Sequence, residues 1–344
     1  MLSSKEKYRL YCQEKNTTVP IFSRDWWLDA VCGENNWDVL IMEKDHRIAA
    51  SLPYSLHIKH GLKMIQQPEL TFTSGVWLEY PPHQKPAKKL SYEKKLMGGI
   101  IRQLESLKID YFSQTFSPYI TNWLPFYWAG YQQTTAYTQR IEDIADIEKL
   151  WQSFPNENNV RNNIRKAEKR LIIRNDLELA ELIRLKDLTF ARQGLTSAYH
   201  YEFIARVDAA CQEHNARRMF FAQDAQGRVH AALYLIWDPD SAYYILGGED
   251  PDLRNSEANS LLIWEAIKFA STVTRVFDFE GSMIERIERF FRSFSPVQTP
   301  LLTITKMSRR MKLAHHGNQL FKAIANRPMV LGGETLQYVR NKKQ

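Results

Sequence analysis

Cysteine is scarce in this chain of 344 residues, which has only Cys12, Cys32 and Cys211. An odd number of widely separated cysteines argues against a disulfide framework, and no cysteine or histidine pair has the spacing of a zinc site. We therefore expect reduced thiols in the apolar core and no bound metal. Glycine and proline are also few, at 14 residues each, which excludes a collagen-like or low-complexity chain.

Long apolar runs are missing as well. No segment approaches the roughly 20 consecutive apolar residues that cross a bilayer, and residues 1–7 are too polar for a signal peptide. The chain also lacks the glycine-rich loops that bind dinucleotides or nucleoside triphosphates, and the nucleophile elbow of α/β hydrolases. These absences favour a soluble cytoplasmic protein without any of those three sites.

Acidic residues are almost absent from the last part of the chain. From Lys306 onward, nine lysines and arginines stand against one acid, Glu334, which gives this stretch a formal charge of +8. The whole chain carries +7, so residues 1–305 carry −1. The basic character therefore belongs to a C-terminal extension.

A second basic cluster lies within residues 160–171. It contains Arg161, Arg165 and Lys166, which are candidate contacts for an anionic ligand. A solvated surface explains either basic cluster equally well.

Helical and strand patterns alternate along the chain, which predicts an α/β fold with mixed sheets. In the first half they predict helices over 23–32, 92–107 and 121–129, and strands over 38–43, 47–54, 109–112 and 131–141. The strands over 38–43 and 47–54 are separated by a short polar turn and are expected to form a hairpin.

Two stretches of the first half resemble stretches of the second. Val39–Leu52 is similar to Met219–Leu233, each having four apolar residues, a polar turn and a second strand that ends in leucine. Phe126–Tyr131 and Phe290–Phe294 both read as the end of a short helix before a strand. We infer a duplication. The predicted division is into domains at 1–155 and 156–306, with a basic extension at 307–344.

The second half contains a sequence of elements that is suited to holding an anion. A strand over 242–246 runs into Gly247 and Gly248, and a helix is predicted over 258–270. Ser256 is a suitable N-cap for this helix, and Arg254 lies in the loop before it. Free N–H groups at the helix start and the arginine can bind an anion together.

Acidic residues follow two neighbouring strands of this half. Glu249 comes directly after Gly248, and Asp278 and Glu280 lie at the end of a strand predicted over 275–280. Acyl transfer to an amine needs a proton acceptor and N–H donors for the oxyanion. The three acids are candidate proton acceptors, and backbone N–H groups near Gly247 and Gly248 are candidate oxyanion donors. The competing interpretation is structural, with Asp278 buried and hydrogen-bonded and the other two acids solvated.

These stretches resemble a known family. The elements over 242–270, residues 277–282 and 287–295, and a closing strand over 301–305 look like the second half of the Fem-type peptidoglycan-bridge aminoacyltransferases. Residues 162–169 resemble the basic helix that opens the second domain of these proteins. The family carries two tandem GNAT (acyl-CoA N-acyltransferase) domains. The resemblance therefore implies two GNAT-like domains and an N-acyltransferase.

The resemblance also implies cosubstrates and binding residues. The donor would be acyl-CoA or aminoacyl-tRNA, with no tightly bound cofactor, and the acceptor an amine on a small molecule, a sugar or a cell-wall precursor. Arg254 and Arg292 would anchor an anionic group of the substrates. A GNAT phosphate loop would begin at Arg254 and have small residues where this chain has Glu257 and Asn259. At the position where members of the family have a lysine, this chain has Phe291, and Arg292 is the next residue.

A second class of function stays open on the same fold. A noncatalytic protein would use Arg161, Arg165, Lys166 and the basic extension to bind RNA or an anionic membrane surface. The sequence leaves the donor, the acceptor and the oligomeric state open.

Overall fold

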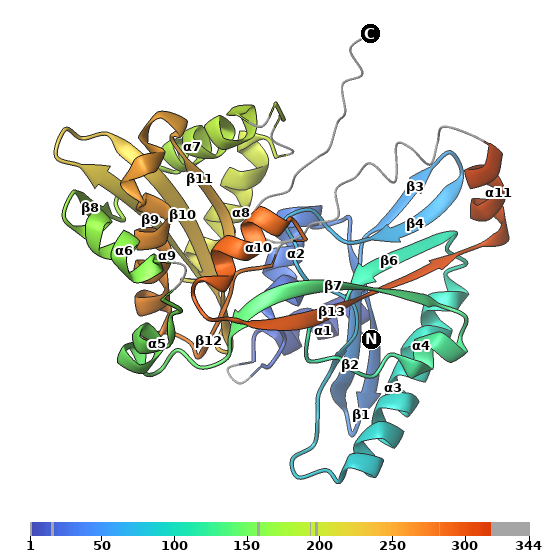
Figure 1. Ribbon diagram of the computed structural model, residues 1–344. Helices are drawn as coiled ribbons and strands as arrows, with labels where there is room; N and C mark the ends of the chain where they lie inside the picture. Colours follow the sequence, from blue (N-terminus) through green and yellow to red (C-terminus); the bar gives the residue numbers. More distant parts are fainter. Residues whose placement is uncertain are drawn as a thin grey trace. The chain divides into compact units, whose positions relative to one another are not determined.

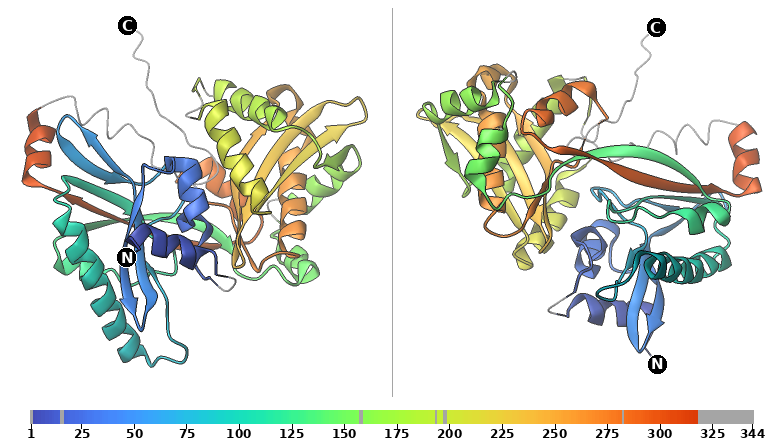
Figure 2. Two further views of the ribbon diagram at one scale, coloured as in Figure 1. Left: turned by 180° about the vertical axis from the view of Figure 1, so that it is seen from behind. Right: turned by 60° about the horizontal axis from the view of Figure 1, so that its bottom comes forward.

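The computed structural model describes residues 2–14, 17–156, 159–192, 194–196, 199–281 and 283–317. These residues form two compact units. Unit 1 comprises the described residues up to 136 together with those from 300 onward, and unit 2 comprises those from 137 to 299. Figures 1 and 2 show the elements of each unit, coloured along the sequence from blue at the N-terminus to red.

Unit 1 contains, in chain order, α1 (Ser4–Cys12), the 3-10 helix η1 (Ile21–Ser23), α2 (Asp25–Cys32), β1 (Asp38–Lys44), β2 (Arg47–Tyr54), β3 (Leu56–Lys59), β4 (Leu62–Gln66), β5 (Trp77–Leu78), α3 (Pro86–Ser106), β6 (Tyr111–Thr115), α4 (Leu124–Trp128) and α11 (Arg309–Gly317). The strands β1, β2 and β5 form an antiparallel sheet. The strands β3, β4, β6 and β13 (Val297–Met307) are adjacent in that order, with β4 parallel to β6 and the other pairs antiparallel.

Local sequence explains how the helices of unit 1 begin. Ser3 and Glu6 form a reciprocal capping box at the start of α1. Pro86 occupies the first turn of α3, where its missing N–H costs no hydrogen bond. The apolar side of α3 packs with β1, β2 and α4 around a core that includes Ile100 and Phe126.

Unit 2 contains α5 (Ile147–Ser153), α6 (Val160–Glu168), β8 (Leu171–Arg174), α7 (Leu179–Arg192), α8 (Tyr201–Glu213), β9 (Arg217–Asp224), β10 (Val229–Trp237), β11 (Ser241–Glu249), the 3-10 helix η2 (Pro251–Ser256), α9 (Ala258–Ala270), β12 (Val276–Asp278) and α10 (Glu285–Arg292). The end of β7 (Gln132–Ile141) pairs with β12, and the order continues through β11, β10 and β9 to β8. Among the described strands of unit 2, only β11 and β12 are parallel, so this sheet is mixed, as predicted.

Helices cover both faces of the unit 2 sheet. Alternate residues of β10 show this, because Leu233 lies in the core with α9 whereas the hydroxyl of Tyr234 donates to Asp208 of α8. Gly248 of β11 lies against the backbone of α7. The predicted helix over 258–270 is α9 with the same bounds. Its N-cap, however, is Glu257 rather than Ser256, which ends η2.

The predicted hairpins form in both halves. β1 pairs with β2 and β9 pairs with β10, each antiparallel with one register shift. Their neighbours differ, since β1 is an edge strand whereas β9 and β10 lie inside the unit 2 sheet. The strand predicted over 275–280 ends earlier, at Asp278, because Glu280 and Gly281 adopt positive φ angles of 56° and 57°.

The chain passes between the units within two strands. It leaves unit 1 inside β7 and returns inside β13, so the structure divides the chain at residues 136–137 and 299–300. The boundary predicted near residue 155 comes just after α5, within unit 2.

The basic extension is not separate from the fold at its start. Met311 of α11 is buried against Leu62 and Met64, and Ser308 hydrogen-bonds Asp110. The remainder of the predicted extension, residues 318–344, lies outside the described part of the chain. Of the helices that the structure describes, none combines the length and apolarity needed to span a membrane.

Candidate active site

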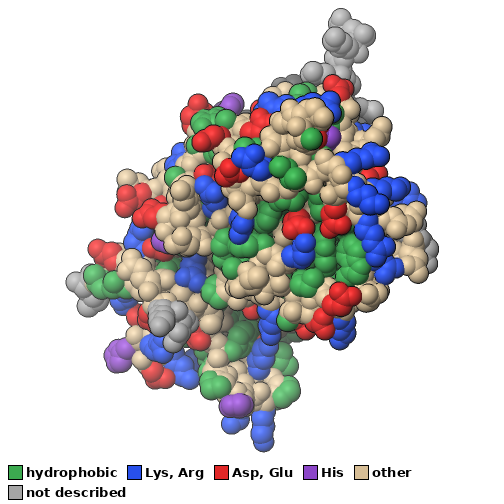
Figure 3. All heavy atoms as spheres, turned by 90° about the vertical axis from the view of Figure 1, so that its left-hand side faces the viewer, with side chains coloured by type: hydrophobic (Ala, Val, Ile, Leu, Met, Phe, Trp, Pro, Cys, Tyr) green, Lys and Arg blue, Asp and Glu red, His purple; other side chains and the backbone are tan. Residues whose placement is uncertain are grey.

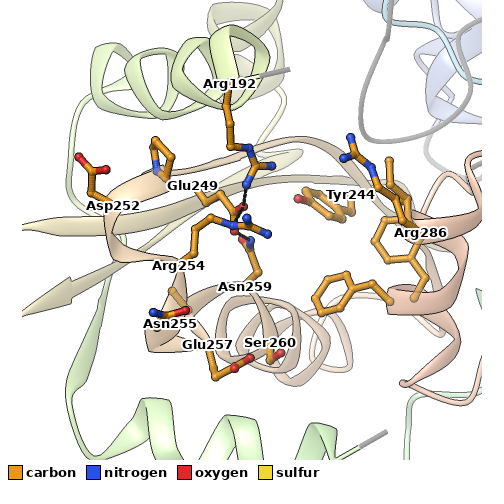
Figure 4. Close-up of a pocket in the computed structure, with 15 residues that line it drawn as sticks. Arg192, Tyr244, Glu249, Asp252, Arg254, Asn255, Glu257, Asn259, Ser260 and Arg286 are labelled. Atoms are coloured by element: carbon orange, nitrogen blue, oxygen red, sulfur yellow. Dashed lines mark hydrogen bonds and ion pairs between the residues drawn. The ribbon is translucent and has the colours of Figure 1, made fainter. Parts of the chain in front are cut away.

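A pocket of about 640 Å³ lies in unit 2, at the C-terminal end of β11 and the N-terminal end of α9 (Figure 4). Its walls come from the end of α7, the second half of β11, η2, the first turn of α9 and α10. The lining residues are Arg192, Tyr244, Glu249, Pro251, Asp252, Arg254, Asn255, Glu257, Ala258, Asn259, Ser260, Arg286, Ile287, Phe290 and Phe291.

One edge of β11 is open at this pocket. β11 pairs with β12 only from Ser241 to Tyr243, although it continues to Glu249. In the described residues, the later part of that edge has no strand partner. Backbone polar groups along such an edge can bind a ligand, but those of Glu249 are already hydrogen-bonded to the hydroxyl of Thr189.

The two glycines of β11 differ in what surrounds them. A Cβ at Gly248 would lie 2.3 Å from backbone atoms of Leu185 and Lys186, so glycine permits the close approach of α7. A Cβ at Gly247 would lie 2.0 Å from the hydroxyl of Tyr244. Gly247 therefore makes room for a tyrosine hydroxyl that the pocket includes.

Glu249 is the centre of an ion-pair and hydrogen-bond group. Its Oε1 lies 2.9 Å from Nη1 of Arg192 and 2.8 Å from Nε of Arg254. Nδ2 of Asn259 donates to Oε2 at 2.6 Å. Figure 4 shows this group on one side of the pocket and Tyr244 and Arg286 on the other. A carboxylate that is bonded to two guanidiniums and an amide fixes the positions of all three groups. The competing interpretation expected Glu249 to be solvated, which differs from this arrangement.

The first turn of α9 adds polar backbone groups. Glu257 is the N-cap in a left-handed conformation, with φ 61°, and no side chain caps the helix. Its carbonyl accepts from the N–H groups of Ser260 and Leu261. The N–H groups of Ala258 and Asn259, the first two helical residues, come before the first of these helical hydrogen bonds. Both residues line the pocket, so the positive end of the helix dipole lies at the pocket.

Asp278 lies outside this lining. It is 2% exposed on β12, accepts hydrogen bonds from the hydroxyl of Thr138 and the N–H of Glu280, and lies 3.5 Å from Nε of Arg140. Burial raises the pKa of its carboxyl to about 6, while the nearby Arg140 and the hydrogen bonds oppose this shift. Its buried, hydrogen-bonded state matches the structural interpretation. Glu280, predicted as solvated under that interpretation, is 4% exposed.

The predicted cations lie in three places. Arg254 lies in the pocket, whereas Arg292 is exposed at the end of α10 and pairs with Glu288 at 3.5 Å. Arg161 and Lys166 lie on α6, and Arg165 of the same helix stacks on the ring of Trp151 at 5.6 Å. The part of the pocket lining that the structure describes includes none of the three α6 cations.

Among the pocket residues that sequence reasoning missed are Arg192, Tyr244 and Arg286. Arg192 is the last residue of α7, and only the fold brings it to Glu249, 57 positions later. Tyr244 had a signal, since it lies in the predicted strand three residues before Gly247.

Comparisons with known proteins agree with this architecture. Residues 156–283 match the family model described as an acetyltransferase (GNAT) domain. The fold is similar to that of FemX, at 10% identity and a TM-score of 0.67, with 93% of this chain and 99% of the other covered. It is also similar to L-PGS from Bacillus licheniformis, at 10% identity and a TM-score of 0.50, covering 90% and 94%. No curated protein matched the sequence.

The likeness to these structures extends over nearly the whole chain, while the family model covers the part of unit 2 that supplies most of the pocket lining and ends before the lining residues of α10. The predicted resemblance is confirmed at the level of the fold. The chain has the Fem-like tandem GNAT fold, and residues 156–283 carry the GNAT acetyltransferase domain match.

Proposed function

We propose that the protein is an N-acyltransferase whose donor binds in the unit 2 pocket. The observation that carries this is the open edge of β11 beside the uncapped start of α9, within the residues that match the GNAT domain. An acyl group can hydrogen-bond along a free strand edge, while an anionic part of the donor lies at the helix start.

The reaction needs few groups. The amine nitrogen attacks the acyl carbon, the N–C bond forms, and the bond to the oxygen or sulfur of the donor breaks. Of the backbone N–H groups near Gly247 and Gly248, that of Gly247 is the proposed oxyanion donor, because alternate N–H groups of a strand point to opposite edges and that of Gly248 points toward β10. The hydroxyl of Tyr244 is the proposed proton donor to the leaving group, because it reaches the pocket beside Gly247.

Glu257 is the better candidate for the amine proton. It lines the pocket, whereas the carboxylate of Glu249 already accepts from Arg192, Arg254 and Asn259. We therefore assign Glu249 to positioning of the two arginines. Asp278 and Glu280 stay proposals for a proton path, since both lie outside the described pocket lining.

Charge alone does not select the donor. Three arginines, Arg192, Arg254 and Arg286, face three acids, Asp252, Glu249 and Glu257. The pocket therefore has no strong excess of positive charge for the pyrophosphate of CoA, and Glu257 stands at the helix start where that group would bind. Acyl-CoA and aminoacyl-tRNA both remain proposed donors, with an amine of a sugar or cell-wall precursor as acceptor. A cytoplasmic location stays a prediction.

The test is transfer of a labelled acyl group by the purified full chain. One series would use an acyl-CoA panel and a second would use charged tRNAs, each with amino sugars and cell-wall precursors as acceptors. Tyr244→Phe should lower kcat with little change in KM, and Arg254→Ala should mainly raise KM. Arg275→Ala is the matched control, because Arg275 is exposed and pairs with Asp240 away from the pocket. Absence of transfer and of binding with both donor classes would overturn the proposal.

The noncatalytic alternative depends on α6 and the basic extension. Figure 3 shows lysine and arginine side chains interspersed with acidic ones around a hydrophobic area, rather than a face of one charge. Arg165 is partly engaged with Trp151. Binding of RNA that survives loss of Arg161 and Lys166 would place that activity elsewhere.

A further inference from the structure

Large hydrophobic side chains are exposed on two adjacent helices of unit 1, α3 and α4. Leu124, Tyr127 and Trp128 of α4 are 48%, 58% and 59% exposed, and Leu90 of α3 is 55% exposed. The two helices pack against each other (Figure 1). We call these four residues the aromatic surface. Single exposed hydrophobic residues are ordinary, but a group on neighbouring helices indicates an interaction site.

The geometry of α4 explains why these side chains are exposed. This short helix buries Pro125 and Phe126 in the unit 1 core, which turns its other side chains outward. Tyr127 is held by an edge contact with Trp123 at 5.4 Å. The aromatic rings are thus presented by a helix that is anchored from beneath.

Lysines surround the aromatic surface. Nζ of Lys94 lies 5.0 Å from the centre of the Trp128 ring, and Leu90 is one turn before Lys94 on α3. Lys88, Lys89 and Lys95 are also exposed on this helix.

The acids of α3 cancel only part of this charge. Glu93 is buried and accepts hydrogen bonds from Tyr80 and Asn122, at 2.9 and 2.8 Å, and its Oε1 also lies 4.0 Å from Nζ of Lys89. Glu105, the other acid of α3, lies 2.7 Å from Nζ of Lys306. The first half of α3 is therefore positively charged beside exposed aromatic and aliphatic side chains.

We propose that the aromatic surface docks on the headgroup region of an anionic lipid bilayer. Tryptophan and tyrosine favour the membrane–water interface, and lysines beside them are attracted to anionic headgroups. The exposed leucines Leu90 and Leu124 favour a membrane over single-stranded RNA as the binding partner of this surface. Bases stack on aromatic rings and gain little from exposed leucines, whereas leucine side chains gain by entering acyl chains. This surface is separate from the α6 cluster and from the unit 2 pocket.

Flotation of the full chain with vesicles tests the proposal at 0.15 M salt. Vesicles of phosphatidylcholine with 30% phosphatidylglycerol should bind the protein, and pure phosphatidylcholine should bind it less. Tyr127→Ala/Trp128→Ala should lower the partition into anionic vesicles about tenfold, since apolar burial and charge both contribute to interfacial binding. Lys94→Glu/Lys95→Glu should lower it in anionic vesicles alone.

Two controls separate the surface from general effects. Ile172→Ala/Tyr201→Ala removes side chains that are 59% and 50% exposed in unit 2, and Lys149→Glu reverses an exposed lysine there. Brominated acyl chains should quench the fluorescence of the wild type more than that of Trp128→Phe. Equal partition of the Tyr127/Trp128 variant and the wild type would overturn the proposal. So would a variant that loses single-stranded RNA binding but keeps vesicle binding.

Discussion

Nε of Arg254 lies 2.8 Å from Oε1 of Glu249, the same oxygen that lies 2.9 Å from Nη1 of Arg192. One carboxylate thus joins the end of α7, the end of β11 and the loop before α9. Residues that were predicted as a catalytic acid and an anion-binding arginine are partners of each other. Their pairing fixes the position of both arginines at the pocket.

Glu249→Gln should destabilise the protein by about 2 kcal/mol, because a carboxylate with a 17% exposed side chain loses its ion pairs to Arg192 and to the more exposed Arg254, each worth at most about 1 kcal/mol. Urea unfolding would measure this as a lower midpoint at constant m-value. Glu257→Gln lines the same pocket and is the matched control, with an expected change below about 1 kcal/mol. Equal effects of the two substitutions would contradict the central role of Glu249.

Asp278 should make stability depend on pH. Its pKa is raised from 3.8 to about 6, mainly by burial, so the native state binds the proton more tightly than the unfolded chain. This contribution to stability is fully present below about pH 4 and is lost as the pH rises to about 6. The loss amounts to about 3 kcal/mol, from 1.36 kcal/mol per pKa unit.

Asp278→Asn should remove that dependence, since an amide does not titrate and its oxygen can still accept from Thr138 and Glu280. The measurement is the free energy of unfolding of both proteins from pH 4 to pH 7. The wild type should lose stability relative to the variant over this interval. Parallel profiles would show that Asp278 has an ordinary pKa.

Met311 should stabilise unit 1 although it follows the start of the basic stretch. Met311→Ala should cost about 2–4 kcal/mol, because Met311 is 2% exposed against Leu62 and Met64. Leu313→Ala is the control on the same helix, since Leu313 is 74% exposed. Its expected effect is below about 0.5 kcal/mol. Thermal or urea unfolding measures both, and a similar cost for the two variants would contradict the packing of α11.

Truncation after Thr305 would remove part of the fold, although the basic extension was predicted to begin at residue 307. The last residues of β13, Lys306 and Met307, pair with Phe112 and Tyr111 of β6. Truncation there removes strand pairing and the packing of Met311 together. Counting charge located the basic stretch, but charge does not indicate which of its residues are buried.

Periodicity predicted the fold well where local pattern and burial agree. The helix over 258–270 has a clear apolar face, and its bounds match α9, although its N-cap is Glu257 and not the predicted Ser256. The sequence pattern did not indicate that β7 and β13 each have residues in both units. Strand pairing between residues far apart in sequence depends on topology, which a local pattern does not contain. Arg192 was missed for the same reason.

The candidate site was predicted in part. Glu249, Arg254 and Asn259 do meet, because a strand end, a short loop and a helix start follow each other closely in the chain. Asp278 does not join them in the described lining. Sequence order placed it beside β11, but its side chain is buried with Thr138 and Arg140 of β7.

The two glycines of β11 should respond differently to alanine. Gly248→Ala should cost about 3 kcal/mol or more, because the new Cβ would lie 2.3 Å from backbone atoms of Leu185 and Lys186, and backbone cannot rotate away. At Gly247 the new Cβ would lie 2.0, 2.8 and 2.9 Å from the hydroxyl oxygen, Cζ and Cε2 of Tyr244, the far end of a side chain that can move at lower cost.

The displaced Tyr244 is what makes the second substitution informative about function. Gly247→Ala should leave the unfolding midpoint close to that of the wild type but lower kcat of the proposed transfer, since the hydroxyl must leave its place in the pocket. Gly248→Ala should instead lower stability first. Unfolding curves and single-turnover transfer rates on the same preparations separate the two effects. A Gly247→Ala protein that is fully active would show that the position of the Tyr244 hydroxyl is irrelevant to the reaction.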